Sequence, residues 1–242
     1  MPVDVKKAHC IFEYIYFARL DSKIDNISVY EARIRGGATL AKTYPVDADL
    51  VCGVPDSGLA SAKGYSEESG IPFGLAFHKN SYVGRTFIKP TQKERESSVK
   101  IKLSVLESVV KGKRIVLVDD SIVRGTTISN LITMLRKAGA TEVHVRISSP
   151  PFLYPCYFGT DVPSNKQLIA SSHSTEEIRQ QIGATLLATC RSRNSRTWSA
   201  ICRSAVHAST AITQWKYRNR ISALFSKADS ISSTLPRRHC VR

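Results

Sequence analysis

The stretch that most constrains this chain is Lys113 to Thr127, which reads KRIVLVDDSIVRGTT. Ile115 to Val118 is an unbroken, mostly β-branched apolar run, as expected of a central parallel strand that is covered on both faces. The run ends in Asp119 and Asp120. These carboxylates are therefore predicted to lie at the carboxyl end of the strand, where open α/β sheets bind their ligands.

A helix is predicted to follow, because apolar side chains recur at helical spacing from Ile128 to Ala138. Thr126 or Thr127 is its predicted N-cap, and Gly139 supplies a left-handed stop. Another strand is predicted from Glu142 to Ile147. The three elements make a βαβ unit, so the predicted fold class is α/β with a mainly parallel sheet.

The loop between strand and helix suits an anion, because it combines backbone N–H groups, hydroxyls and the positive end of a helix dipole. Two carboxylates beside a phosphate would repel the ligand unless they meet ribose hydroxyls or Mg²⁺. A sugar phosphate with a bound metal is therefore predicted. Solvated acids at a strand end are the ordinary alternative, but a DD pair followed at once by S-x-x-R-G-T-T favours the ligand site. The predicted phosphate-binding residues are Ser121, Ile122, Val123, Arg124, Gly125, Thr126 and Thr127.

A second anion site is predicted earlier in the chain. Asp49 to Val54 is a predicted buried strand, and Leu59 to Ser69 is a predicted helix that ends at Gly70. The turn between them reads VPDSG. It is predicted to hold a diphosphate with its Mg²⁺ through Asp56, Ser57 and Gly58. An ordinary βα turn is the alternative, and the presence of the later phosphate loop favours the functional interpretation.

Near the N-terminus, Ile11 to Phe17 is predicted as an aromatic strand, followed by a helix with Ser28 as N-cap and Glu31 at N3. Pro72 to Phe77 is another predicted strand. Residues 79–102 are polar, basic and poorly periodic, which is typical of a loop. We expect this loop to close over a polyphosphate and exclude water, with a solvated β-hairpin as the alternative. Its predicted contacts are Tyr82, Arg85, Lys89 and Arg95.

The net charge of +15 is unevenly distributed along the chain. Residues 1–183 hold 24 Lys and Arg against 19 Asp and Glu, whereas residues 184–242 hold 11 against one, Asp229, and no Gly. Because the excess belongs mainly to a tail, it argues against a nucleic-acid partner for the rest of the chain. With 42% hydrophobic residues, the 242-residue chain can bury one good core.

The chain is expected to be cytosolic. No membrane-spanning segment stands out, and the first ten residues, MPVDVKKAHC, contain no apolar run typical of a signal peptide. Its thiols should then be reduced or metal-bound. No C-x-x-C occurs, so neither a zinc knuckle nor a thioredoxin-like pair is indicated. The six cysteines are Cys10, Cys52, Cys156, Cys190, Cys202 and Cys240.

Over about residues 8–184 the chain resembles the phosphoribosyltransferase domain of the glutamine phosphoribosylpyrophosphate (PRPP) amidotransferase family. The segments that carry the resemblance are, in order, CIFEYIYFARLDS, RGGATLA, VPDSG, YVGRTFIKPTQKER, VLVDDSIVRGTT, ISSPPFLYPCYFGTD and SHSTEEIRQQIGA. The resemblance implies a type I phosphoribosyltransferase fold with helices on both faces of the sheet, and a homo-oligomer in the intact family. It also implies a pentosyltransferase that makes 5-phosphoribosylamine from PRPP and ammonia with release of diphosphate, the first step of purine synthesis.

The resemblance also assigns parts of the substrate to residues. The 5-phosphate would lie on residues 121–127, the ribose and Mg²⁺ at Asp119 and Asp120, and the diphosphate with Mg²⁺ at Ser57. Family members begin with a glutaminase domain that supplies ammonia from glutamine, and this chain starts after it. We therefore expect an activity that depends on free ammonia, and no catalytic nucleophile is assigned.

In one branch of the family, four cysteines hold a 4Fe–4S cluster. Cys10 and Cys156 match the first two, but the C-x-x-C that supplies the other two is absent. We therefore expect an incomplete cluster site, with two buried thiols as the alternative.

The resemblance ends after Ala184, where the composition changes. The segment ATLLATCR can be encoded so that one restored base gives ADSLGHLS, which is similar to the family's continuation. We therefore expect a domain at residues 1–184 and an off-frame, disordered basic tail at 185–242, with a genuine partner-binding tail as the alternative. A fold relative that regulates by binding nucleotide or RNA, and an inactive fragment, are the alternative functions. A salvage enzyme acting on a free base is less favoured, because VPDSG and YVGRTFIKPTQ argue against it.

Overall fold

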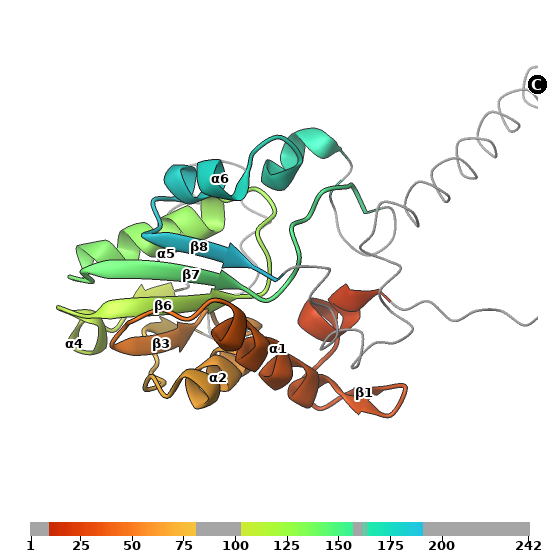
Figure 1. The fold of residues 1–242 in the computed structure, drawn as a ribbon, viewed down its shortest axis with the longest axis horizontal. Helices are drawn as coiled ribbons and strands as arrows, with labels where there is room; N and C mark the ends of the chain where they lie inside the picture. Colours follow the sequence, from red (N-terminus) through yellow and green to blue (C-terminus); the bar gives the residue numbers. More distant parts are fainter. Residues whose placement is uncertain (1–9, 81–102, 157–161, 163, 191–242) are drawn as a thin grey trace, which may run out of the picture.

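The central sheet is parallel and four-stranded in a computed structural model that describes residues 10–80, 103–156, 162 and 164–190 (Figure 1). Its strands lie in the order β3, β6, β7, β8, and each neighbouring pair runs in the same direction. Parallel neighbours require crossover connections, which helices supply here. The strands are β3 (Leu50–Gly53), β6 (Arg114–Asp119), β7 (Glu142–Ile147) and β8 (Leu186–Thr189), and the longer helices are α1 (Val29–Thr43), α2 (Gly58–Ser69), α5 (Thr126–Lys137) and α6 (Thr175–Ile182).

Helices cover both faces of this sheet. Successive residues of a strand point to opposite faces, so alternate residues of one strand pack in different cores. Ile115 and Leu117 of β6 pack in one core with α5 and α6. Val116 and Val118 pack in the other core with α1 and α2. Figure 1 shows α1 and α2 on one side of the sheet and α6 on the other. The predicted α/β class with helices on both faces is confirmed.

None of the helices in the described ranges is long and apolar enough to cross a membrane.

Shorter elements surround the sheet. The shorter elements are η1 (Glu13–Phe17), β1 (Lys23–Ile24), β2 (Ile27–Ser28), β4 (Phe77–Lys79), β5 (Leu103–Val105), α4 (Glu107–Val110), η3 (Asn165–Gln167) and η4 (Ile169–Ser171).

Several predicted boundaries are confirmed. Strand β7 spans the predicted residues, and β6 extends the predicted run by one residue at each end. Helix α1 begins after Ser28, whose hydroxyl accepts a hydrogen bond from the N–H of Glu31 at 3.4 Å. Helix α2 ends at Gly70, which has a left-handed φ of 74°.

Three local predictions are wrong. The segment Ile11 to Phe17 is helical, and η1 within it is a π-turn in which the N–H of Ala18 bonds to the Glu13 carbonyl at 2.9 Å. The predicted strand from Pro72 to Phe77 does not form over that range. Phe73 makes a single parallel bridge with Val51 of β3, and β4 begins only at Phe77. The N-cap of α5 is Gly125, because its left-handed φ of 79° turns the loop into the helix and leaves the two threonines inside the first turn.

The sheet continues beyond Ala184, where the domain boundary was predicted. Strand β8 pairs with β7 through four residues, from His144 opposite Leu186 to Ile147 opposite Thr189. Residues 185–190 therefore belong to the sheet and its edge, whereas residues 191–242 lie outside the described residues.

Two glycines let α1 and α2 pack with their backbones in contact. A Cβ atom on Gly37 would overlap the Ser61 carbonyl oxygen, and one on Gly64 would overlap the Ile34 carbonyl oxygen. This close approach brings both helices onto the face formed by β3 and β6.

We expect Gly64→Ala to lower the free energy of unfolding by about 1 to 3 kcal/mol, because the added methyl group overlaps backbone that has no room to move. The same change at an exposed helix position stabilises by up to about 1 kcal/mol. Urea denaturation measures the difference. Lys63→Ala, at the exposed preceding residue, is the control and should change stability by less than about 0.5 kcal/mol. A stabilised Gly64→Ala variant would contradict the packing described here.

Candidate functional site

A cavity of about 630 Å³ opens at the carboxyl ends of β3 and β6. This is the edge of the sheet at which parallel α/β proteins bind ligands. All seven residues of the loop from Ser121 to Thr127, here called the phosphate loop, line the cavity. Its other lining residues are Phe12, Tyr16, Phe17, Val54, Ser57, Asp119, Asp120, Ile128, Phe152 and Val162.

The carboxylate of Asp120 joins the two predicted anion sites. Its side chain accepts hydrogen bonds from the hydroxyls of Ser57 and Ser121. The N–H of Asp120 in turn donates to Asp119 Oδ1 at 2.8 Å. The serine before α2 and the acids after β6 therefore form one connected group, although 63 positions separate Ser57 from Asp120.

Both acids are buried, with 8% of Asp119 and 7% of Asp120 exposed. Burial raises the pKa of Asp119 well above its ordinary value, and the charge of Asp120 raises it further. Burial also raises the pKa of Asp120, although the bonds from Ser121 and Ser57 and the charge of Arg33 oppose that rise. Two adjacent carboxylates in this environment favour either a proton or a bound cation.

The glycine that begins α2 brings Ser57 to these acids. A Cβ atom on Gly58 would lie 2.5 Å from the Val118 carbonyl oxygen, so only glycine lets the helix start against the end of β6. The third predicted member of this turn, Asp56, does not line the cavity; its exposed carboxylate pairs with Lys79. Of the predicted diphosphate turn, Ser57 thus lines the cavity, and Gly58 positions Ser57 through its packing on Val118.

The phosphate loop presents unused backbone donors. Within the described residues, none of the N–H groups from Ser121 to Thr127 donates a hydrogen bond. The outer side of the loop is held by η4, because the Ile169 N–H donates to the Val123 carbonyl at 2.9 Å. The Arg124 side chain reaches Gln167 and so points toward η3.

Four aromatic residues, here called the aromatic wall, also line the cavity. They are Phe12, Tyr16 and Phe17 from the N-terminal segment, and Phe152, whose ring meets that of Phe12 edge to face at 5.2 Å. Such pairs add to the stability of a packed wall. The residues predicted here as a strand therefore reach the site from a helical segment.

Arg33 is a functional candidate that sequence reasoning missed. Only 4% of this residue is exposed, and its guanidinium donates to the carbonyls of Tyr14 at 2.8 Å, Ala18 at 2.9 Å and Tyr16 at 3.4 Å. It thereby fixes η1 beside the cavity, and its charge favours the ionised form of Asp120. The signal in the sequence was an arginine among the small and apolar residues of one side of a predicted helix. Because arginine is rarely buried unless it is paired, such a position indicates a specific partner.

Four of the predicted site residues fall in a segment that the structure does not describe. Tyr82, Arg85, Lys89 and Arg95 lie outside the described residues, so their predicted contacts with substrate stay predictions.

Cys10 is exposed and Cys156 is half-buried, so the alternative of two buried thiols is wrong. The two thiols lie close enough for their charges to interact, since partial desolvation and the charge of Cys156 both raise the pKa of Cys10. Cys52 is in the core, where burial raises its pKa to about 12, so it is a poor metal ligand. Across the described ranges, no group of three or more His, Cys, Asp or Glu side chains could hold a metal ion. These residues therefore do not complete the four-thiolate site that a 4Fe–4S cluster needs.

The family model described as "Phosphoribosyl transferase domain" matches residues 25–148, which contain both turns and the two acids. The chain belongs to the phosphoribosyltransferase family. Among curated relatives of this phosphoribosyltransferase, the Amidophosphoribosyltransferase of Bacillus subtilis is 57% identical over 185 residues, or 76% of this chain and 39% of that protein. The Amidophosphoribosyltransferase of Methanocaldococcus jannaschii is 59% identical over 176 residues, or 73% of this chain and 37% of that protein.

A solved structure supports the same relationship. It is described as glutamine phosphoribosylpyrophosphate (PRPP) amidotransferase from B. subtilis complexed with ADP and GMP. The two folds have a TM-score of 0.74 and 54% sequence identity, over 83% of this chain and 44% of that one. The chain thus spans about two fifths of the length of the curated relatives it matches.

We expect Asp119→Asn to stabilise the protein in the absence of ligand. Because the pKa of Asp119 is higher in the folded than in the unfolded state, the folded state binds more protons between the two values, and this carboxyl lowers stability as pH rises through that range. Asn carries no charge, yet its Oδ1 can still accept from the Asp120 N–H. The variant should gain about 1 to 3 kcal/mol at neutral pH.

The measurement is urea unfolding of both proteins from about pH 4 to pH 8, a range that starts near the ordinary pKa of Asp. The stability difference between variant and wild type should grow as the pH rises. Glu67→Gln, at an exposed position of α2, is the control and should show little effect, because an exposed ion pair such as the one it makes with Lys63 contributes little to stability. A variant that is less stable than wild type at every pH would refute the electrostatic account of this pair.

Proposed function

We propose that this site binds PRPP with Mg²⁺ and transfers the phosphoribosyl group to ammonia, releasing diphosphate and forming 5-phosphoribosylamine. The observation that carries the proposal is the hydrogen bond between Ser57 and Asp120, which places the turn before α2 and the phosphate loop in one cavity. A substrate with a phosphate at one end and a diphosphate at the other needs two such anion sites at a fixed separation.

The 5-phosphate is assigned to the phosphate loop. Its unused N–H groups and the N-terminus of α5, a helix of 12 residues, favour a bound anion, and the hydroxyls of Thr126 and Thr127 add donors. The diphosphate is assigned to Ser57 and the N-terminus of α2. The ribose hydroxyls are then left to the carboxylates of Asp119 and Asp120, which accept hydrogen bonds when ionised.

The same carboxylates fit Mg²⁺. This ion takes oxygen ligands and is typically held by one or two carboxylates together with substrate phosphates, which matches the small donor set of Asp119, Asp120 and Ser57. The raised pKa of each acid supports this assignment, because a cation would offset the negative charge that burial disfavours. When bound, Mg²⁺ would offset the negative charge that develops on the departing diphosphate.

The residues of this chain would act by positioning and by electrostatics. Backbone donors of both turns hold the two charged ends of PRPP, and the carboxylate of Asp120 faces the positive charge that develops on the ribose. The nitrogen lone pair of ammonia forms a bond to C1 as the C1–O bond to diphosphate breaks, with inversion at C1. The aromatic wall at Phe12 and Phe17 restricts access of competing water. Ammonia needs no general base, so none is assigned.

The decisive experiment measures diphosphate release from PRPP with Mg²⁺ and ammonium chloride. We expect turnover with ammonium and none when free purine or pyrimidine bases replace it. The double variant Asp119→Asn, Asp120→Asn should lose activity while remaining folded. Turnover that is unchanged in the double variant, or specific for a free base, would refute the proposal. RNA binding without turnover would favour the regulator instead.

A second experiment tests the phosphate loop. Thr126→Val removes one hydroxyl from the first turn of α5, and we expect the KM for PRPP to rise by about tenfold, as for one lost hydrogen bond to a charged group. Thr133→Val, on the exposed side of the same helix, is the matched control and should leave KM unchanged. Equal KM values for all three proteins would place the 5-phosphate elsewhere.

We also propose that a change of reading frame produced the basic tail, so that the evolved fold does not include residues 191–242; β8, which follows the predicted boundary at Ala184, belongs to the sheet. The abrupt loss of glycine and the charge imbalance support this proposal. Resequencing the coding DNA from codon 184 through codon 191 tests it. A confirmed frame, together with protection of residues 191–242 from limited proteolysis, would show that the segment is genuine.

A further inference from the structure

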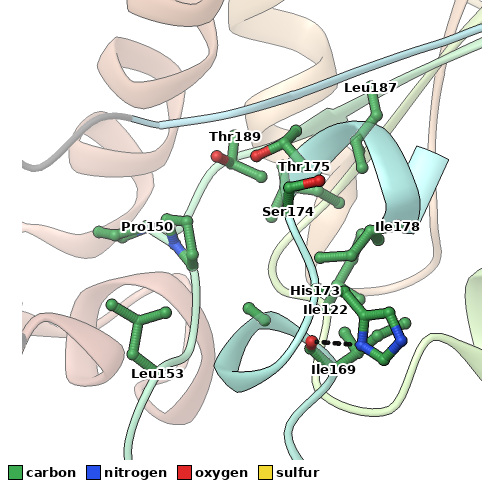
Figure 2. Close-up of a pocket in the computed structure, with 13 residues that line it drawn as sticks. Ile122, Pro150, Leu153, Ile169, His173, Ser174, Thr175, Ile178, Leu187 and Thr189 are labelled. Carbon is green, nitrogen blue, oxygen red and sulfur yellow. Dashed lines mark hydrogen bonds between the residues drawn. The ribbon is translucent and has the colours of Figure 1, made fainter.

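A second cavity, of about 210 Å³, lies behind the phosphate loop (Figure 2). It is situated at the carboxyl ends of β7 and β8, beneath η4 and the start of α6. Ile122, Ile147, Ile169 and Ile178 contribute apolar side chains that are all less than 10% exposed. Leu153 lies on the opposite side and is 43% exposed, so the cavity is open to solvent there.

The lining defines the chemistry of a ligand. The lining contains His173, whose Nδ1 lies 3.2 Å from the Ile169 carbonyl, but no Asp, Glu, Lys or Arg, so a charged group would lose its hydration with little compensation. Thr175 and Thr189 both line the cavity, as Figure 2 shows, and neither hydroxyl is hydrogen-bonded within the described residues. They can meet one polar group of a ligand whose remainder is apolar.

The volume limits the size of that ligand. An apolar protein cavity of about 150 Å³ holds a benzene molecule. A cavity of 210 Å³ therefore suits one ring or two fused rings, and is too small for a nucleotide or a peptide segment. An uncharged aromatic molecule with one hydrogen-bonding group satisfies both limits.

The wall between the two cavities is shared. Ile122 lines both, and is only 9% exposed although it belongs to the phosphate loop. Ile169 lines the second cavity, and its N–H holds the loop through the Val123 carbonyl. A molecule packed against these two side chains would restrict the loop from its outer side.

We propose that this second cavity is an effector site for a small, uncharged aromatic molecule with one hydrogen-bonding group, and that its occupation tightens PRPP binding at the phosphate loop. The inference rests on the proposed function for the identity of the coupled ligand. Because coupling between two binding sites is reciprocal, PRPP must tighten binding of the aromatic molecule by the same factor.

The experiment uses indole as the probe and calorimetric titration as the measurement. We expect indole to bind with a dissociation constant of about 1 mM or tighter, as is reasonable for nine non-hydrogen atoms. Saturating indole should tighten binding of Mg²⁺–PRPP by about fivefold, and PRPP should tighten indole binding equally. No saturable indole binding, or binding that leaves PRPP affinity unchanged, would overturn the inference.

Three variants locate the probe. Ala170→Phe adds a ring inside the cavity and should abolish indole binding, whereas Leu186→Phe, at a residue that is 45% exposed and outside the lining, should leave it intact. Thr189→Val keeps the volume and should weaken indole binding by about threefold to tenfold. Indole binding that is unchanged in both Ala170→Phe and Thr189→Val would refute this location.

The two proposals fail separately. If the wild-type chain binds no PRPP, the proposed function fails, and the indole titrations with their variants still test the cavity. If PRPP binds and turns over but indole neither binds nor alters its affinity, only the effector site is refuted.

Discussion

The Asp120 carboxylate accepts hydrogen bonds from the hydroxyls of Ser57 and Ser121, and the rest of the site depends on this pair of contacts. Ser57 follows β3 and Ser121 follows β6, two neighbouring parallel strands. The bonds therefore fix two backbone turns against each other at the ligand-binding edge of the sheet. The separation between the proposed phosphate and diphosphate sites is set by the strand spacing and by the packing of Gly58 on Val118.

This arrangement costs stability. Two adjacent acids are buried where, among the described residues, hydroxyls and one backbone N–H bond to them, and burial raises the pKa of both. Arg33 offsets part of the cost, since its buried charge favours ionised Asp120 while its hydrogen bonds hold η1 in place. A protein optimised only for folding would carry neutral residues here. Retention of the charges is expected of a site that a cationic ligand completes.

The phosphate loop borders two cavities. Its backbone donors and hydroxyls face the larger cavity, and Ile122 also faces the smaller, apolar one. The loop is thus part of the packing between the sheet and α6, because η4 binds it from outside. Any change in that packing reaches the proposed phosphate site through one or two residues.

The sequence by itself determined the elements whose signals are local. The apolar run before Asp119, the Ser28 cap and the left-handed glycine after α2 are each encoded within a few residues, and the structure confirms them. The sequence also predicted that the acids and the loop after β6 belong to one ligand site, because a strand end followed by hydroxyls and glycine is itself a local pattern.

Tertiary structure alone decided how distant segments meet. The Ser57–Asp120 bond spans 63 positions, and it requires β3 to pair with β6, which no local pattern specifies. The aromatic N-terminal segment has the composition of a strand, yet its carbonyls are bound by Arg33, so it is helical and forms the cavity wall. Likewise β8 forms beyond the predicted boundary, because the β7 edge offers a ladder of backbone partners to a short apolar segment. Local propensity is weak, and the free energy of burial and of long-range hydrogen bonds exceeds it.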